Sequence, residues 1–184
     1  GGTYTITDRT PVAPVTPVAP SKPADKPDET KPTEMTYPDV QPTDWYYEAV
    51  EAVTEKGLMS GTDNGFEPNL ATSRAMIWTV LARMDGKTVS GSGSEWYAAA
   101  QSWASENGVS DGSDPNGRIT REQFAAMLYR YALRQGRAGA DAAANFAGFA
   151  DVESVSDWAR DAMRWAVSSG IINGIDGRLC PQGE

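Results

Sequence analysis

Apolar residues recur at helical spacing in several stretches of the chain, and the clearest stretch follows Thr120. Its apolar positions lie three or four residues apart, as on one face of an α-helix: Phe124, Met127, Leu128 and Tyr131. Thr120 and Gln123 occupy the two positions of a capping box, in which each side chain binds the backbone N–H of the other residue. The pattern therefore predicts a helix that begins at Arg121.

A second stretch upstream has the same pattern and also opens with an arginine, Arg74. Its apolar positions match the first set: Ile77, Val80, Leu81 and Met84. A cation in the first turn is unfavourable by about 0.3–1 kcal/mol, because the amino end of a helix carries partial positive charge. Each arginine therefore predicts an anion beside it. That anion is either a nearby carboxylate, such as Glu122 beside Arg121, or an anionic ligand that also binds the free N–H groups of the first turn.

Three tryptophans predict three further helices, because small or apolar residues follow each of them at intervals of four, seven and eight. The stripes are Trp45, Ala49, Ala52 and Val53; Trp96, Ala100, Trp103 and Ala104; and Trp158, Ala162, Trp165 and Ala166. We interpret these stripes as core rather than as surfaces that stack on sugars. Each is followed by two glycines that would end the helix and start a turn: Gly57 and Gly61, Gly108 and Gly112, Gly170 and Gly174.

Each repeat thus has the order helix, glycine-punctuated loop, helix, which predicts an all-α fold. Repeat 1 spans residues 37–88, repeat 2 spans 89–147, and repeat 3 spans 148–184 and ends before its second helix. Because two short helices cannot bury an apolar face alone, we expect the repeats to pack on one another. The missing helix predicts that the stripe from Trp158 to Ala166 lacks its partner. We expect the native protein to continue into a further helix, and this form either to self-associate through the incomplete repeat or to be markedly less stable.

The residues before the repeats lack the composition of a folded domain. Residues 10–36 are a proline-rich linker whose early prolines recur at the spacing of one polyproline II turn. Residues 1–9 contain a short strand-like run without a sheet to join, which we interpret as the remnant of an upstream domain.

Composition excludes several function classes. The net charge of −9 argues against nucleic acid as a partner, which needs a basic surface. The chain has no histidine and one cysteine, Cys180, so zinc sites and His-dependent triads are not expected. A calcium-loop pattern counted from Asp111 places Pro115 and Asn116 where the geometry is strictest, so we expect neither metal nor cofactor. No apolar run is long enough for membrane insertion.

From Tyr37 onward, the pattern resembles the S-layer homology (SLH) domain family. The resemblance rests on the aromatic-x-Asp-Val openings at Tyr37 and Phe149, the tryptophan-led helices, the Gly-x-x-x-Gly loops with a following proline, and the Thr-Arg-Glu-Gln run from Thr120. It implies tandem repeats around a pseudo-threefold axis, with grooves that bind a secondary cell wall polysaccharide, often carrying pyruvylated N-acetylmannosamine. In this family the arginine of the Thr-Arg motif is associated with that anionic sugar, and the matching residues here are Arg74 and Arg121.

The resemblance implies a non-catalytic module that holds an exported protein on the bacterial cell wall or S-layer, outside the cell. One alternative is a protein–protein module in a surface lattice. The other is a wall-active glycosidase that uses Asp39 and Asp151, although these two acids stand at equivalent positions that suit capping better than catalysis. The sequence departs from the family where Met76 replaces an acid or amide, and repeat 2 lacks the aromatic-x-Asp-Val opening.

Overall fold

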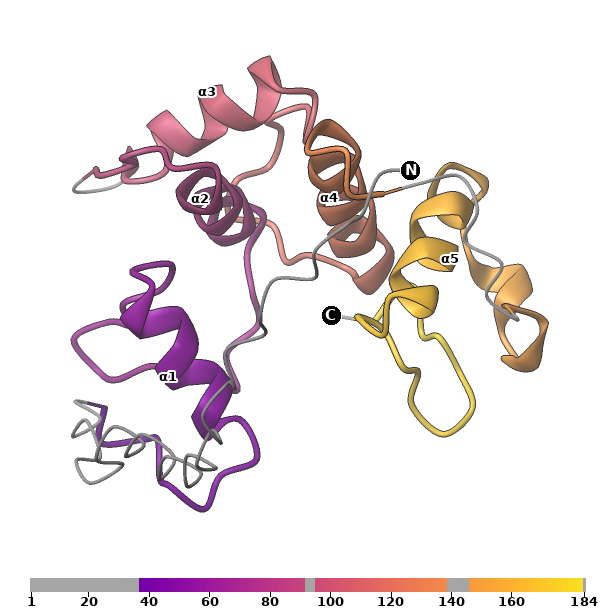
Figure 1. Cartoon of the computed structure of the whole chain (residues 1–184), viewed down its shortest axis with the longest axis horizontal. Coiled ribbons are helices and arrows are strands. Elements are labelled where there is room, and N and C mark those ends of the chain that lie inside the picture. Colours follow the sequence, from indigo (N-terminus) through magenta and orange to yellow (C-terminus); the bar gives the residue numbers. More distant parts are fainter. Residues whose placement is uncertain (1–36, 92–94, 139–145, 184) are drawn as a thin grey trace, which may run out of the picture. The chain divides into compact units, whose positions relative to one another are not determined.

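The computed structural model describes residues 37–91, 95–138 and 146–183, and these residues are mainly helical (Figure 1). The α-helices are α1 (Tyr47–Glu55), α2 (Arg74–Met84), α3 (Ala98–Glu106), α4 (Arg121–Arg134) and α5 (Arg160–Ser168). Three short 3₁₀ helices lead into the last of them: η2 (Phe146–Gly148), η3 (Val152–Ser154) and η4 (Asp157–Ala159). The described residues form isolated β-bridges and no strand, which confirms the all-α prediction. The interpretations of residues 1–9 and 10–36 lie outside the described residues.

The helices α2 and α4 begin at the two predicted arginines. In α4, Thr120 Oγ1 accepts a hydrogen bond from the N–H of Gln123 at 3.3 Å, and Gln123 Oε1 accepts one from the N–H of Thr120 at 3.2 Å. In α2, Ser73 caps the helix in the same way, and Met76 Sδ accepts from the N–H of Ser73 at 3.4 Å. The thioether that departs from the family pattern therefore still closes the cap, as a weaker acceptor.

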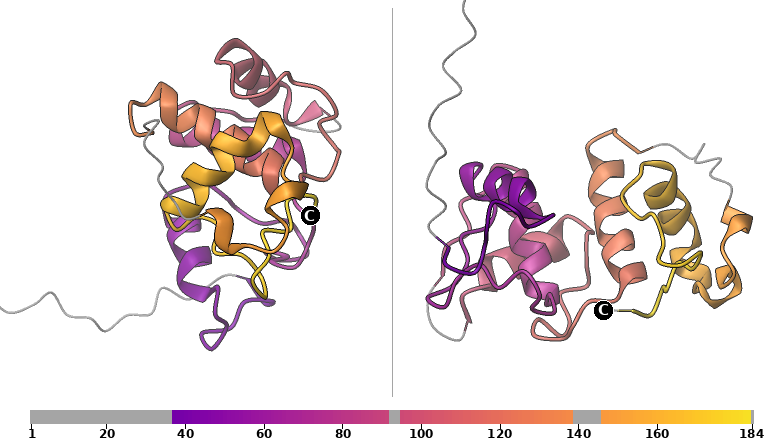
Figure 2. Two further views of the ribbon diagram at one scale, coloured as in Figure 1. Left: turned by 90° about the vertical axis from the view of Figure 1, so that its right-hand side faces the viewer. Right: turned by 90° about the horizontal axis from the view of Figure 1, so that it is seen from below.

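The repeats pack across their sequence boundaries. The helix α2, which ends repeat 1, packs against α3 of repeat 2, and α4 of repeat 2 packs against α5 of repeat 3 (Figures 1 and 2). Two apolar clusters result. One lies between α2, α3 and one face of α4, and includes Trp78, Trp103 and Tyr131. The other lies between α4 and α5, where Ala125 and Met163 are buried. The expectation that the repeats pack on one another is confirmed.

The prediction of an uncovered face on α5 is wrong. Ala162 and Ala166 are 3% and 0% exposed, because α4 covers them. Trp165 is partly buried and its ring lies 5.5 Å from that of Tyr129 on α4. The first helix of repeat 3 thus takes its partner from the repeat before it, and the reason given for self-association through α5 is removed.

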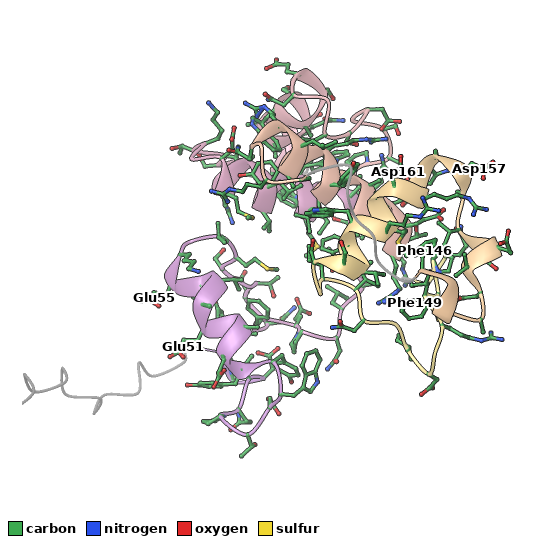
Figure 3. All side chains as sticks on the ribbon, turned by 45° about the vertical axis from the view of Figure 1, so that its right-hand side comes forward. Glu51, Glu55, Phe146, Phe149, Asp157 and Asp161 are labelled. Carbon is green, nitrogen blue, oxygen red and sulfur yellow. The ribbon has the colours of Figure 1, made fainter. Side chains whose placement is uncertain are left out.

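The helix that lacks a closely packed partner among the described residues is α1. Val50 is its buried residue, whereas Ala49 is exposed and Ala52 and Val53 are half-buried. Glu51 and Glu55, one turn apart, project from one side of α1 (Figure 3). The predicted stripe of α1 is therefore not core in this structure.

The interpretation of the three leading tryptophans as core is also wrong. Trp45, Trp96 and Trp158 are 93%, 37% and 56% exposed. Each precedes its α-helix by two residues, since α1, α3 and α5 begin at Tyr47, Ala98 and Arg160. These side chains thus lie outside the helical periodicity from which their burial was predicted. The face of α2 matches its predicted position only in part. Leu81 is buried and Ile77 packs against the same cluster, as predicted, but Met84 is exposed and three residues outside the predicted set are buried: Ala75, Trp78 and Ala82.

Candidate functional site

The two predicted site residues lie in equivalent places. Arg74 Nε donates to the carbonyl of Ser113 at 2.8 Å, and Arg121 Nε donates to the carbonyl of Leu179 at 2.9 Å. Both carbonyls lie in the loop of the following repeat, two residues before its proline. Each arginine therefore contacts the loop of the next repeat.

The same loops bind the first N–H groups of both helices. The bonds run from Arg74 to Gly117 (3.0 Å), from Ala75 to Pro115 (2.9 Å), from Arg121 to Gly183 (2.8 Å) and from Glu122 to Pro181 (3.0 Å). The expectation that free N–H groups in the first turn bind an anionic ligand is therefore wrong, because backbone carbonyls already occupy them. A ligand at either place would have to bind through the guanidinium.

At Arg74 the predicted anion is a carboxylate of the chain itself. Asp111 Oδ1 lies 2.9 Å from Arg74 Nη2, and Ser110 Oγ lies 3.2 Å from the same nitrogen. The guanidinium also lies over the Trp78 ring, 5.8 Å from its centroid. Hydrogen bonds from Ser113, its backbone N–H foremost, lower the pKa of Asp111 and keep the carboxylate charged. Arg74 is thus neutralised within the protein.

Glu122, named as the nearby carboxylate for Arg121, binds elsewhere. Its buried carboxylate accepts hydrogen bonds from Ser156 N at 3.0 Å, from Ser156 Oγ at 2.8 Å and from Gln182 Nε2 at 2.7 Å. Within the described part of the chain, no carboxylate lies at ion-pair distance from the Arg121 guanidinium. The guanidinium donates from Nε to the carbonyl of Leu179. The structure therefore separates two arginines that the sequence made equivalent.

Arg121 also lines a cavity of about 640 Å³, which we call the Arg121 pocket. Its walls are residues 68–72 from the loop of repeat 1, residues 118–121 before and at the start of α4, Ile77 and Phe124. The N–H of Ile119 donates to the carbonyl of Thr72 at 3.0 Å and joins the two walls. Leu70 and Phe124 give the pocket apolar surface beside the arginine. It thus combines a cation, hydrogen-bonding groups and apolar walls, as small-molecule sites do.

Asp39 and Asp151 hold the loops rather than face a shared site. Asp39 accepts from the N–H groups of Phe66 and Glu67 at 2.9 and 2.7 Å, and Asp151 accepts from those of Leu179 and Cys180 at 2.7 and 2.8 Å. These bonds lower the pKa of Asp39. For Asp151, burial raises the pKa but the two backbone bonds outweigh it and the net change is downward. The prediction that these acids cap the nearby helix starts is wrong, because Asp151 makes no capping bond to η3 and both carboxylates bind N–H groups of a distant loop instead.

The aromatic residue of each aromatic-x-Asp-Val motif packs so closely against a loop glycine that a larger residue would not fit there. A Cβ placed on Gly61 would lie 2.7 Å from a ring carbon of Tyr37, and one on Gly174 would lie 2.6 Å from a ring carbon of Phe149. Both glycines also have positive φ, +65° and +76°. The ring, the aspartate and the glycine therefore act together to shape the loop.

Two equivalent contacts within the repeats were not predicted from the sequence. Arg83 Nη1 donates to the carbonyl of Leu58 at 2.8 Å, and Arg130 Nη1 donates to that of Val109 at 3.3 Å. Each bond ties the second helix of a repeat to the residue after the first helix and its glycine. The signal was available, because Arg83 and Arg130 follow Arg74 and Arg121 by the same interval.

The described residues hold no group of three acidic or cysteine side chains that could bind a metal ion. None of the described helices is long and apolar enough to cross a bilayer. We take the Arg121 pocket as the candidate site because it contains one of the two arginines predicted from the sequence.

The profile of the S-layer homology domain matches residues 36–75 and 148–183 of this chain. Repeat 2 lies between these matches, yet it has the same left-handed residue before the loop proline: Glu67, Asp114 and Cys180 have φ of 56°, 49° and 49°. It also has its own arginine contact, Arg130 to Val109.

Relatives of this chain include both enzymes and surface-layer proteins. Amylopullulanase of Thermoanaerobacterium thermosulfurigenes is 30% identical over 77% of this chain, which spans 8% of that protein. Exoglucanase XynX of Acetivibrio thermocellus is 26% identical over 76% of the chain, which spans 14% of it. The S-layer protein sap of Bacillus anthracis is 30% identical over 80% of the chain, which spans 19% of it. The chain is therefore similar to a small part of proteins with different names.

Proposed function

Because this chain belongs to the S-layer homology domain family, whose domains anchor proteins to the cell wall, we propose that it attaches an exported protein to the wall by binding an anionic polysaccharide in the Arg121 pocket. Members of this family act at the bacterial cell surface. The attachment is non-covalent and does not involve catalysis. We further propose that repeat 2 is an S-layer homology repeat, so that the domain contains three.

The observation that carries the proposal is the contrast between the two arginines. Arg74 is paired with Asp111 at 2.9 Å, whereas Arg121 lines a pocket and has no carboxylate of the described residues at ion-pair distance. A guanidinium binds a carboxylate through two parallel hydrogen bonds, and pyruvylated N-acetylmannosamine carries one carboxylate on a sugar ring. The volume of about 640 Å³ lies within the range of sites that enclose small ligands. Leu70 and Phe124 would contact the apolar face of the ring.

Two further observations support attachment rather than hydrolysis. Asp39 and Asp151, the acids considered for a glycosidase, each accept two backbone N–H bonds and so are committed to the loops. The relatives that share this stretch include two enzymes with different names and a surface-layer protein, and this chain spans less than a fifth of each. A shared attachment module accounts for a common stretch in such different proteins.

The test is co-sedimentation of the protein with purified wall polymer, before and after chemical removal of its pyruvyl groups. We expect binding to the native polymer and loss of binding to the treated polymer. Arg121→Gln should weaken binding by about 1.5–3 kcal/mol, the scale of a hydrogen bond to a charged group. Arg164→Gln, which removes an exposed arginine on α5, is the control for net charge. Equal binding by the parent and Arg121→Gln would contradict the proposal.

A further inference from the structure

The loop of repeat 2 is shorter than its counterparts. Two residues separate Gly112 from the loop proline, whereas six separate Gly61 from Pro68 and six separate Gly174 from Pro181. The longer loops each contain a bridge, Thr62 to Gly65 and Ile175 to Arg178, that closes a turn. The short loop has no room for that turn, so its glycine and proline lie close together in the chain.

In this short loop, Asp111 binds the backbone N–H group that Asp39 and Asp151 bind in the longer loops. The N–H of Ser113 donates to Asp111 Oδ1 at 2.9 Å, as that of Phe66 donates to Asp39 and that of Leu179 donates to Asp151. All three donors stand two residues before the loop proline. Asp39 and Asp151 come from the segment before the first helix, where repeat 2 lacks the motif. Asp111 comes from the loop itself, and this origin brings its carboxylate against Arg74.

The same oxygen of Asp111 also contacts the guanidinium of Arg74, and the aspartate is the more exposed of the two side chains. Oδ1 lies 2.9 Å from Arg74 Nη2, and the side chain of Asp111 is 70% exposed while that of Arg74 is 13% exposed. In repeat 3 the residue that precedes the second glycine is Asn173, which donates to the carbonyl of Gly170. Among the residues that the structure describes, no carboxylate lies at ion-pair distance from Arg121. A carboxylate of the chain therefore contacts the Arg74 guanidinium, whereas none of the described residues places one at the Arg121 guanidinium.

We infer that Asp111 is a built-in anion that closes the first of two equivalent arginine sites, so that the domain binds a carboxylate-bearing sugar at Arg121 and not at Arg74. The inference rests on the proposed function, because it assumes that the guanidinium receives the carboxylate of the sugar. Asp111 is then the residue that sets the number of sugars bound. Replacing its charge opens a second site, because the remaining contacts of Arg74, with Ser113 O and with the Trp78 ring, hold the side chain in place.

The variant Asp111→Asn tests this directly. The amide oxygen still accepts from the N–H of Ser113, so the turn is retained while the charge is lost. Asp114→Asn is the matched control: it makes the same change in the same loop, and Asn tolerates the positive φ of 49° at that position. Asp111→Ser, which keeps a hydroxyl acceptor for Ser113, is the second variant if Asp111→Asn unfolds by circular dichroism.

The measurement is isothermal titration with the methyl glycoside of pyruvylated N-acetylmannosamine. We expect one site in the parent and in Asp114→Asn, two sites in Asp111→Asn, and a return to one site when Arg74→Gln is added. One site in both the parent and the folded Asp111 variants, lost with Arg121→Gln, would overturn this inference and leave the proposed function intact. Two sites in the parent would also overturn it. A parent without binding, or with binding that Arg121→Gln does not change, would overturn the proposed function instead.

Discussion

Glu122 Oε1 lies 2.8 Å from Ser156 Oγ, and through this contact a buried carboxylate of repeat 2 binds the residue that precedes η4 of repeat 3. Its other oxygen accepts the N–H of Ser156 at 3.0 Å, and Gln182 donates to Oε1 at 2.7 Å. The side chain is 2% exposed. One acid therefore joins the start of α4 to both ends of repeat 3.

Removing this acid should destabilise the fold. Glu122→Ala leaves the N–H of Ser156 and the amide of Gln182 without their acceptor, and we expect a loss of about 2–3 kcal/mol in the free energy of unfolding in urea. Glu122→Gln retains an acceptor and should lose less. Glu106→Ala, at the exposed end of α3, is the control and should be close to neutral. Equal stability of the two alanine variants would show that the Glu122 contacts add nothing.

Alanine substitutions at two glycines of repeat 3 should distinguish the cost of backbone strain from the cost of steric overlap. Gly170 and Gly174 have positive φ of +69° and +76°, but an added Cβ meets nothing within 4 Å at Gly170 and a Phe149 carbon at 2.6 Å at Gly174. Gly170→Ala should therefore cost about 1 kcal/mol from the backbone, and Gly174→Ala should cost at least about 1 kcal/mol more. Thermal unfolding of the two variants measures the difference. Identical melting temperatures would contradict the role given to the Phe149 ring.

Two tryptophans should differ sharply in their contribution to stability. Trp45 is 93% exposed, so Trp45→Ala should change the free energy of unfolding by no more than about 0.5 kcal/mol. Trp103 is 6% exposed and its Nε1 donates to Asp85 at 3.1 Å, so Trp103→Ala should cost about 3–5 kcal/mol. Denaturant titration of both variants checks the contrast. A large loss with Trp45→Ala would instead support its assignment to the core.

The free energy of unfolding should decrease at acidic pH, because the aspartates that bind the loops become protonated. The pKa of Asp151 lies below its ordinary value of 3.8 in the folded chain, because its backbone hydrogen bonds outweigh the effect of burial. The unfolded chain then binds a proton first, so the stabilisation is present above about pH 4 and is lost as the pH falls through the folded pKa. Asp151→Asn should flatten this acid limb of stability against pH. Asp161→Asn, which removes the same charge from α5 (Figure 3), is the matched control.

Local chemistry made parts of this fold predictable from sequence. The capping box of Thr120 and Gln123 lies within four residues, so its geometry follows from the sequence alone. The glycines after α1, α3 and α5 have the predicted left-handed φ, of 65°, 65° and 69°, for the same reason. Both candidate arginines accordingly stand at the predicted helix positions.

Features set by distant residues could not be predicted in this way. Periodicity identifies an apolar face but not the helix that covers it, so the partner of α5 was assigned to a missing segment when it is α4. The pairing of Arg74 with Asp111 depends on the length of a loop in another repeat. The equivalence of the two arginines in sequence therefore concealed their difference in space.

The pairing of α2 with α3 and of α4 with α5 has a mechanical consequence. A cut between residues 88 and 89, where the sequence pattern ends one repeat, would separate two helices that share one apolar cluster. The cooperative unit is thus half a repeat out of phase with the sequence unit, and hydrogen exchange in α2 should follow that in α3 rather than that in α1. Tension along the chain cannot then be relieved by unravelling a single sequence repeat, because each shares a packed interface with its neighbour.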